Sequence, residues 1–180
     1  GYIAEEPTAF SVTQTDDTLT YIPLKNNDTG FTATKEDTGI AIGLKTGSEL
    51  REKINAVLAG ISEETKLTLM EQMITLSNGG TVEKLALESK NTGEKQGVLK
   101  VGMECAYKPF NWTETSKESV NAVPVSGEGK EGLYCNGYDV QIAKYVADEL
   151  NMELEVYAYE FDSLISAVNA GTIDAIVAGM

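Results

Sequence analysis

The amino-acid sequence predicts an α/β fold with a doubly wound, mostly parallel sheet and helices on both faces. Residues 98–103, VLKVGM, alternate between apolar and polar positions as a strand does. Residues 173–179, IDAIVAG, form a nearly continuous apolar run, which is typical of a strand covered on both faces. Two helical patterns and a further strand lie between them, after a polar, Gly/Ser-rich insertion at 113–133. Strands that alternate with helices favour right-handed crossovers and a parallel sheet.

The two predicted helices of this half have recognisable ends. Asp139 can cap the first helix, and Asn151 is its expected end. Asp162 can cap the second helix, and Gly171 stands where a left-handed residue usually ends one. Residues 153–159, ELEVYAY, are expected to form the strand between the two helices. The apolar residues at helical spacing are Ile142, Ala143, Val146, Ala147 and Leu150 in the first helix and Leu164, Ile165 and Val168 in the second.

The first half of the chain has weaker signals. Residues 1–7, GYIAEEP, are expected to form a short strand that ends in two acids, with Pro7 in the first turn of a helix. Residues 39–44, GIAIGL, also predict a strand. Residues 77–97 are mainly polar and charged and are interpreted as a linker.

Two more helices are predicted before this linker. Thr46 and Glu49 fit a capping box ahead of a helix that Gly60 ends. Ser62 is expected to cap a second helix, which continues to residues 78–80. The inward residues are expected to be Leu50, Ile54, Val57 and Leu58 in the former and Leu67, Leu69, Met70, Met73 and Ile74 in the latter.

Composition excludes several classes of function. Twenty-eight acidic against fourteen basic residues give a net charge of −14, which repels nucleic acid. The chain has no histidine, so histidine-based catalysis and histidine-ligated zinc are excluded. Its two cysteines cannot form a four-cysteine metal site, and we expect no cofactor and no metal. No apolar run is long enough to cross a bilayer, so direct membrane insertion is not expected.

The predicted sheet locates a candidate site. In doubly wound sheets, ligands bind outside the carboxyl ends of the strands. Three predicted strands end at residues 104–110, ECAYKPF, at the 159–161 corner and at residues 178–180. An acid and several aromatic side chains therefore gather at the edge of the sheet where a ligand would bind.

Three motifs of the second half are VLKVGMECAYKPFNW, NGYDVQIAKYVADEL and FDSLISAVNAGTIDAIVAGM. They resemble the opening lobe of a type II periplasmic (solute) binding protein of the polar amino-acid ABC transporter family. Residues 1–76 resemble the closing segment of the same family, through GYIAEEPTA and GIAIGLKTGSELREKINAVLAG. The resemblance implies one lobe made of a closing segment, 1–76, a linker, 77–97, and an opening segment, 98–180. The order is a circular permutation of the family's order, and the second lobe is largely missing.

The resemblance also implies which residues contact a ligand. They are Glu104, Tyr107, Phe161, Ala178, Gly179, Met180 and Glu5. Glu104 matches the family's side-chain-sensing acid, and Tyr107 and Phe161 match the aromatic residues that sandwich the ligand side chain. Ala178 and Gly179 would offer backbone carbonyls to an ammonium group, which Glu5 would also bind. Each residue also has an ordinary structural interpretation: a solvated acid at a strand end, or a half-buried aromatic residue. Phe110 and Trp112 are interpreted as packing residues.

We therefore expect extracytoplasmic, non-enzymatic binding of a basic or polar amino acid, with half of the site present in this chain. A carboxylate beside aromatic faces favours arginine, lysine, ornithine or histidine, and glutamine is the alternative. The expected partners are an ABC transporter permease and a second lobe, which is missing here or supplied by another chain. The parent protein is expected to be periplasmic or anchored to lipid. Two other functions stay open: a ligand-sensing domain of a signalling receptor, and a dehydratase with Glu104 as a general acid.

The two cysteines form a further candidate pair. Cys105 follows the first strand, and Cys135 precedes the first helix of the second half, so both approach the same edge of the sheet. An exported protein permits a disulfide between them. The alternative is two free, half-buried thiols.

Overall fold

The computed structural model describes residues 1, 3–34 and 39–179. The described residues form an eight-stranded sheet in the order β1-β8-β2-β7-β5-β6-β4-β3. The strands are β1 (Gly43–Leu44), β2 (Val98–Met103), β3 (Ala106–Tyr107), β4 (Asn111–Glu114), β5 (Val123–Ser126), β6 (Tyr134–Asn136), β7 (Glu153–Ala158) and β8 (Ala175–Ile176). The helices are α1 (Glu6–Thr15), α2 (Leu50–Ala59), α3 (Glu63–Ser77), α4 (Tyr138–Glu149) and α5 (Phe161–Ala170).

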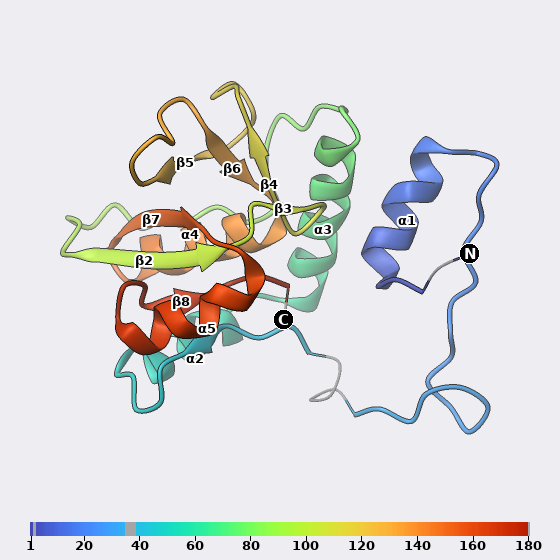
Figure 1. Ribbon diagram of the computed structural model, residues 1–180, viewed down its shortest axis with the longest axis horizontal. Coiled ribbons are helices and arrows are strands. Elements are labelled where there is room, and N and C mark those ends of the chain that lie inside the picture. Colours follow the sequence, from blue (N-terminus) through green and yellow to red (C-terminus); the bar gives the residue numbers. More distant parts are fainter. Residues whose placement is uncertain (2, 35–38, 180) are drawn as a thin grey trace.

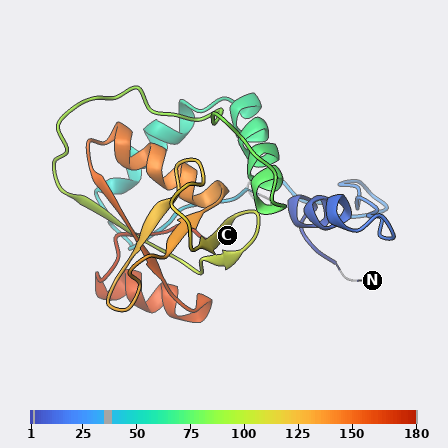
Figure 2. The ribbon, with the colours of Figure 1, turned by 90° about the horizontal axis from the view of Figure 1, so that it is seen from above.

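The centre of the sheet is parallel. Strand β2 pairs with β7 along its whole length, from Val98 opposite Glu153 to Met103 opposite Ala158. Strand β8 continues the parallel pairing on the other side of β2, and β5 does so beyond β7. Helix α4 packs on β2 and β7, α5 packs on β2 and β8, and the two helices lie on opposite faces of the sheet (Figure 2). The predicted doubly wound α/β fold is therefore confirmed.

Antiparallel strands extend this centre. Strand β5 lies within the polar, Gly/Ser-rich insertion at 113–133, for which no strand was predicted. Strand β4 pairs with β6, with Trp112 opposite Asn136, and β6 also pairs with β5. In β5, Val123 and Val125 are buried. Each of these strands is at most four residues long. An alternation this short is diluted by the polar loops around it, so no clear strand signal is present in the sequence there.

Two other predicted strands are shorter than expected, and one is absent. Only 43–44 of the 39–44 segment is a strand, and it pairs antiparallel with β8. Strand β8 itself covers only two residues of 173–179, although the Asp174 and Val177 amides donate to carbonyls of β2. The strand expected at 1–7 is not formed in its described residues, since Ile3 is 86 % exposed with no strand partner. Pro7 does lie in the first turn of α1, as predicted.

The helix ends confirm some predicted caps and correct others. Ser62 caps α3 by accepting a hydrogen bond from the Thr65 amide at 3.1 Å. Gly171 ends α5 with φ at 77°, a left-handed conformation that suits glycine. The capping box at 46–49 is wrong, because Glu49 is itself the residue before α2 and makes no capping bond.

The predicted aspartate caps are also wrong. Helix α4 begins after Gly137 and α5 after Glu160, so Asp139 and Asp162 lie inside the first turn of each helix. An acid in the first turn still interacts favourably with the helix dipole, which produces a similar sequence signal. Leu67, expected to point inward from α3, is 66 % exposed, while Leu69 and Met73 on the same helix are fully buried.

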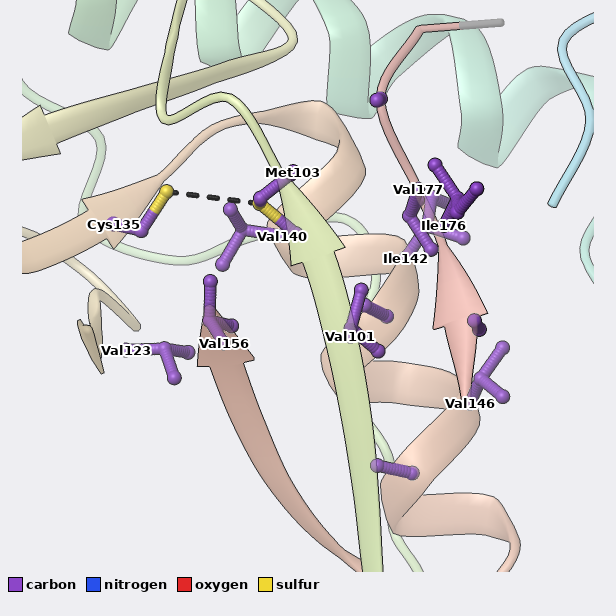
Figure 3. Close-up of a cluster of buried hydrophobic side chains, with 14 of the residues drawn as sticks. Val101, Met103, Val123, Cys135, Val140, Ile142, Val146, Val156, Ile176 and Val177 are labelled. Atoms are coloured by element: carbon purple, nitrogen blue, oxygen red, sulfur yellow. Dashed lines mark hydrogen bonds between the residues drawn. The ribbon is translucent and has the colours of Figure 1, made fainter. Parts of the chain in front are cut away.

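The core lies between the sheet and α4. Figure 3 shows Val101 and Met103 of β2, Val156 of β7 and Val140 of α4 packed together. Residues 78–97 form no helix or strand, and Leu85 and Leu87 within them are buried in the core. This segment is thus held against the rest of the fold.

Residues 6–15 stand apart from the sheet. Helix α1 lies beyond α3, on the side away from β2 and β7 (Figures 1 and 2). The Ser11 hydroxyl donates to Asn78 Oδ1 at 3.1 Å, and Asn78 Nδ2 donates to the Ser11 carbonyl at 3.2 Å. No helix in the described part of the chain is long and apolar enough to cross a membrane.

Candidate functional site

The candidate site lies where β2 and β8 end. After Met103 the chain turns through Cys105, whose φ of 55° is left-handed, and then forms the short β3–β4 hairpin. The end of the chain after β8 reaches the same place. A Cβ atom added to Gly179 would lie 3.2 Å from Tyr107 Cε1 and 3.5 Å from Phe110 Cγ, and the φ of Gly179 is 64°. Glycine is required here both for the backbone conformation and for the close approach.

Two aromatic rings stack on each other at this edge of the sheet. Tyr107 and Phe110 stack with their centroids 5.0 Å apart and their planes at 22°. Phe110 is 1 % exposed and Trp112 is 4 % exposed, which confirms that both are packing residues. Tyr107 is half-buried. One face of the Tyr107 ring therefore packs against Phe110, and the hydroxyl can form a hydrogen bond with another part of the chain.

That hydroxyl reaches Glu5. Tyr107 Oη donates to Glu5 Oε2 at 2.8 Å, although Glu5 lies just before α1 in the first segment of the chain. The contact brings two of the predicted site residues together. Burial is the main cause that raises the pKa of Tyr107, and the Glu5 carboxylate adds to it.

A buried acid behind this edge was missed as a site residue by the sequence. Asp139, in the first turn of α4, is 1 % exposed, and its Oδ2 accepts a hydrogen bond from Asn111 Nδ2 at 2.8 Å. Asn111 Oδ1 in turn accepts from the Cys105 amide at 2.8 Å, and the Gly179 amide also donates to the Asp139 carboxylate. No local pattern reveals this group, because its members are far apart in the sequence.

The environment of Asp139 favours its neutral form. Burial raises the pKa of Asp139 to about 6, and repulsion from Glu5 acts in the same direction. The hydrogen bonds from Asn111 and Gly179 oppose this shift. The acid therefore changes its charge close to neutral pH.

The start of α4 is fixed directly to the hairpin. The Asp139 amide donates to the Phe110 carbonyl at 2.8 Å, and the Tyr138 amide donates to the Pro109 carbonyl at 3.1 Å. Gly137 has a φ of 130°, and a Cβ atom there would clash with the Phe110 carbonyl. A residue with a side chain could not bring the helix this close.

The other predicted ligand residues also follow the carboxyl ends of strands. Glu104 follows β2 directly, is half-buried and forms no hydrogen bond within the described residues. Phe161 begins α5 and is 46 % exposed. The Tyr159 amide donates to the Met103 carbonyl at 2.9 Å, so the ends of β7 and β2 are adjacent. Ala178 is buried. Met180 lies outside the described residues.

The side chains of the two cysteines contact each other in the protein interior near this edge. Their sulfur atoms are 3.1 Å apart, and both residues are buried free thiols, at 4 % exposure for Cys105 and none for Cys135. Cys135 Sγ also lies 3.7 Å from Met103 Sδ (Figure 3). Contact with Cys105, followed by burial, raises the pKa of the Cys135 thiol. Both thiols are more buried than expected, and the disulfide stays a prediction.

Two cavities lie elsewhere. One of about 510 Å³ is lined by residues including Lys53, Glu94, Gln96 and Asn151, near the amino ends of β2 and β7. Another of about 180 Å³ lies beside Lys144. Neither is lined by a predicted ligand residue. Among the described residues, no group of three or more acids or cysteines is placed to hold a metal ion.

Comparison with known proteins finds similarity over part of the chain. Residues 119–180 match the family described as bacterial extracellular solute-binding proteins, family 3. The matched residues hold β5, β6, α4, β7, α5 and β8. By its description, the matching family consists of extracellular solute-binding proteins.

One curated relative is similar to part of this chain. The arginine-binding extracellular protein ArtP of Bacillus subtilis (strain 168) is 32 % identical over 97 residues, which cover 53 % of this chain. The match covers 31 % of the relative, so the chain spans about a third of that protein's length.

Two solved structures also match part of this chain. The L-cystine solute receptor of Neisseria gonorrhoeae, in an unliganded open conformation, is 26 % identical with a TM-score of 0.34. That match covers 47 % of this chain and 29 % of the receptor. An ancestral cationic amino-acid solute-binding protein is 27 % identical with a TM-score of 0.34, over 47 % of this chain and 30 % of that protein.

Proposed function

We propose that this chain provides one lobe of an extracytoplasmic amino-acid binding site and acts in the substrate-binding component of an amino-acid ABC transporter. The observation that carries the proposal is the contact between Tyr107 and Glu5 beside Gly179, at the carboxyl edge of a parallel sheet. The match to extracellular solute-binding proteins and the similarity to an arginine-binding relative support it.

The charges at this edge favour a basic amino acid. Three acids lie at this edge of the sheet or directly behind it: Glu5, Glu104 and Asp139. Lys108, the nearest base along the chain, donates to the Ser77 carbonyl at 2.9 Å and lies 6.0 Å from the Trp112 ring centroid. No ion pair forms with these three acids among the described residues. Their field therefore attracts a cation, and glutamine is the neutral alternative.

The same proposal includes the organisation of the chain. Residues 1–76 are the closing segment of the binding-protein fold, 77–97 are the linker, and 98–180 are the opening segment of the first lobe. A second lobe, from the same or another chain, would complete the site, and the closed form would be presented to the permease. Ligand binding then shifts the population from open to closed states.

The test is a two-dimensional NMR titration of the ¹⁵N-labelled chain with L-arginine, L-lysine, L-glutamine and L-glutamate. We expect L-arginine to shift the amides of residues 104–107 and 178–179 with a millimolar dissociation constant, because one lobe retains only roughly −4 kcal/mol of binding free energy. A micromolar constant for the monomer would contradict the half-site. An absence of shifts with all four amino acids would contradict the function itself.

A further inference from the structure

We propose that Asp139 and Asn111 are positioning residues, which hold the two backbone segments of the ligand site, 104–107 and 178–179, in fixed relation. This inference rests on the proposed function and names residues that the sequence motifs did not assign to the site. Neither side chain contacts solvent: Asn111 is fully buried and Asp139 is 1 % exposed. Both therefore act on a ligand only through the backbone that they hold.

The geometry connects three separate parts of the chain. Asn111 of β4 uses both ends of its amide, accepting from the Cys105 amide at 2.8 Å and donating to Asp139 Oδ2 at 2.8 Å. Asp139, on α4, also accepts a hydrogen bond from the Gly179 amide. The turn after β2, the hairpin and the segment after β8 are thus joined through two buried side chains.

These hydrogen bonds also set the direction of two carbonyl groups. In a planar trans peptide, the N–H and the C=O point in opposite directions. The Gly179 amide belongs to the same peptide unit as the Ala178 carbonyl, so a bond from Gly179 to Asp139 turns that carbonyl away from Asp139. The Cys105 amide fixes the Glu104 carbonyl in the same way. Ala178 is one of the residues predicted to accept a hydrogen bond from the ligand ammonium group.

A purely structural role does not account for a carboxylate here. Within the described residues Asp139 has no basic partner, and Glu5 lies close enough to repel its charge. Buried acids without a cation are costly for stability. The two backbone segments that it holds contain left-handed residues, Cys105 with φ at 55° and Gly179 with φ at 64°. A charged acceptor stabilises these conformations better than a neutral one.

The first test measures L-arginine affinity by NMR in Asp139→Asn and Asn111→Ala variants. Asparagine has one acceptor oxygen in place of two, so we expect about a tenfold weaker affinity from the loss of one hydrogen bond to a charged group. Gln141→Ala is the matched control. Gln141 is buried on the same helix and donates to Asn136 Oδ1 at 2.7 Å and to the Asn121 carbonyl at 3.2 Å, away from both ligand segments. We expect it to lower stability and to leave the affinity within twofold.

The second test is the pH profile of the affinity. Asp139 has a pKa of about 6, so the affinity of the unchanged chain should fall between pH 7 and pH 5, and Asp139→Asn should remove this fall. The other titratable groups that interact with Asp139 are Glu5, Tyr107, Tyr138 and Cys135. The tyrosine and cysteine pKa values are all raised, so these groups stay protonated over this range. The pH profile of the affinity is also measured in Glu5→Gln. The fall in affinity between pH 7 and pH 5 should persist in this variant, because Asp139 causes it and Glu5 does not.

Amide hydrogen exchange in the ligand-free chain separates this inference from the proposed function. In Asp139→Asn, the Cys105 and Gly179 amides should exchange at least about tenfold faster, while the Val101 amide in β2 keeps its protection. Unchanged exchange at both amides would overturn the inference even if the chain binds arginine. Equal loss of affinity in Gln141→Ala would overturn it as well. If the unchanged chain binds no amino acid, the proposed function fails, and the exchange data alone decide whether Asp139 orders the two segments.

Discussion

The Tyr107 hydroxyl donates a 2.8 Å hydrogen bond to the Glu5 carboxylate across 102 positions of sequence. This bond joins the short β3 strand to the residue that precedes α1. Elsewhere, α1 is held by packing on α3 and by the paired hydrogen bonds between Ser11 and Asn78. The bond to Tyr107 therefore helps to place Glu5 at the site.

Replacing Tyr107 with phenylalanine should loosen α1 without unfolding the lobe. The variant keeps the ring stacked on Phe110 but removes the hydroxyl, at a cost of about 1 kcal/mol. Limited proteolysis within residues 16–34 should accelerate about fivefold, while the melting temperature of the lobe changes by less than about 2 °C. Tyr21→Phe is the control, because Tyr21 packs edge-on against Phe10 and its hydroxyl makes no hydrogen bond in the described residues. Equal proteolysis rates in the two variants would contradict the role of the Tyr107 hydroxyl.

Cys105 and Cys135 should form a disulfide in an oxidising medium. The two thiols give up two protons and two electrons to an oxidant such as glutathione disulfide, and one S–S bond forms. The loop-entropy model gives a stabilisation on the order of 3 to 4 kcal/mol for this loop. Alkylation under denaturing, non-reducing conditions followed by mass spectrometry checks the prediction, with Cys135→Ala as the control for a single free thiol. Two alkylated cysteines in the oxidised sample would refute the bridge.

The regular, parallel part of the fold could be predicted from the sequence because its signals are local. Strands β2 and β7 and helices α4 and α5 each carry a period and an end signal within a few residues, such as Gly171 after α5. The antiparallel strands could not be predicted in the same way. The pairing of β4 with β6, for example, joins residues that are far apart in the sequence, as in Trp112 opposite Asn136.

Some residues of the candidate site could likewise be predicted from the sequence, and others could not. The carboxyl-edge rule selected the segment 104–110 after the first predicted strand, and the resemblance to binding proteins then singled out Glu104 and Tyr107 within it. The role of Asp139 could not be predicted, because it depends on hydrogen bonds from Asn111 and Gly179 that no sequence spacing indicates. Its position beside a helix start instead suggested a cap, which is the commoner use of an aspartate there.

The stability of the lobe should decrease between pH 4.5 and pH 7. Asp139 has a pKa of about 6 in the folded chain and about 3.8 when unfolded, so the folded state binds more protons in this range. Its neutral form is therefore favoured by folding, and the advantage is lost as the pH rises through 6. The difference corresponds to roughly 3 kcal/mol. Urea unfolding at pH 5 and pH 7 measures this change in the free energy of unfolding.

Asp139→Asn should remove most of this pH dependence, because asparagine carries no proton to lose. The ion pairs of Asp148 with Lys144 and Lys95 lower the pKa of Asp148, so their contribution changes only below this range. A variant that kept the full decrease between pH 4.5 and pH 7 would show that another group causes it.

Glu104 should determine whether the site prefers a basic ligand. It stands directly after β2, half-buried and without a hydrogen-bond partner in the described residues, so its carboxylate is available to a ligand. A hydrogen bond to a charged group contributes roughly 1.5 to 3 kcal/mol, and a cation over the Tyr107 or Phe161 ring adds about 0.5 to 2 kcal/mol. Together they favour arginine over an aliphatic amino acid by more than about tenfold.

The measurement compares Glu104→Gln with the unchanged sequence in a two-lobed version of the protein, titrated with arginine, lysine, glutamine and glutamate. We expect the substitution to weaken the affinity for arginine and for lysine by about tenfold. The affinity for glutamine should change by less than about threefold, since an amide side chain still accepts a hydrogen bond from the ligand amide. Glu155→Gln on β7 is the control, because Glu155 lies mid-strand and accepts a 2.8 Å hydrogen bond from the Tyr157 hydroxyl. If basic ligands bind no better than glutamate, or keep their affinity after the substitution, Glu104 is a solvated acid at a strand end and the aromatic residues beside it do not select a cation.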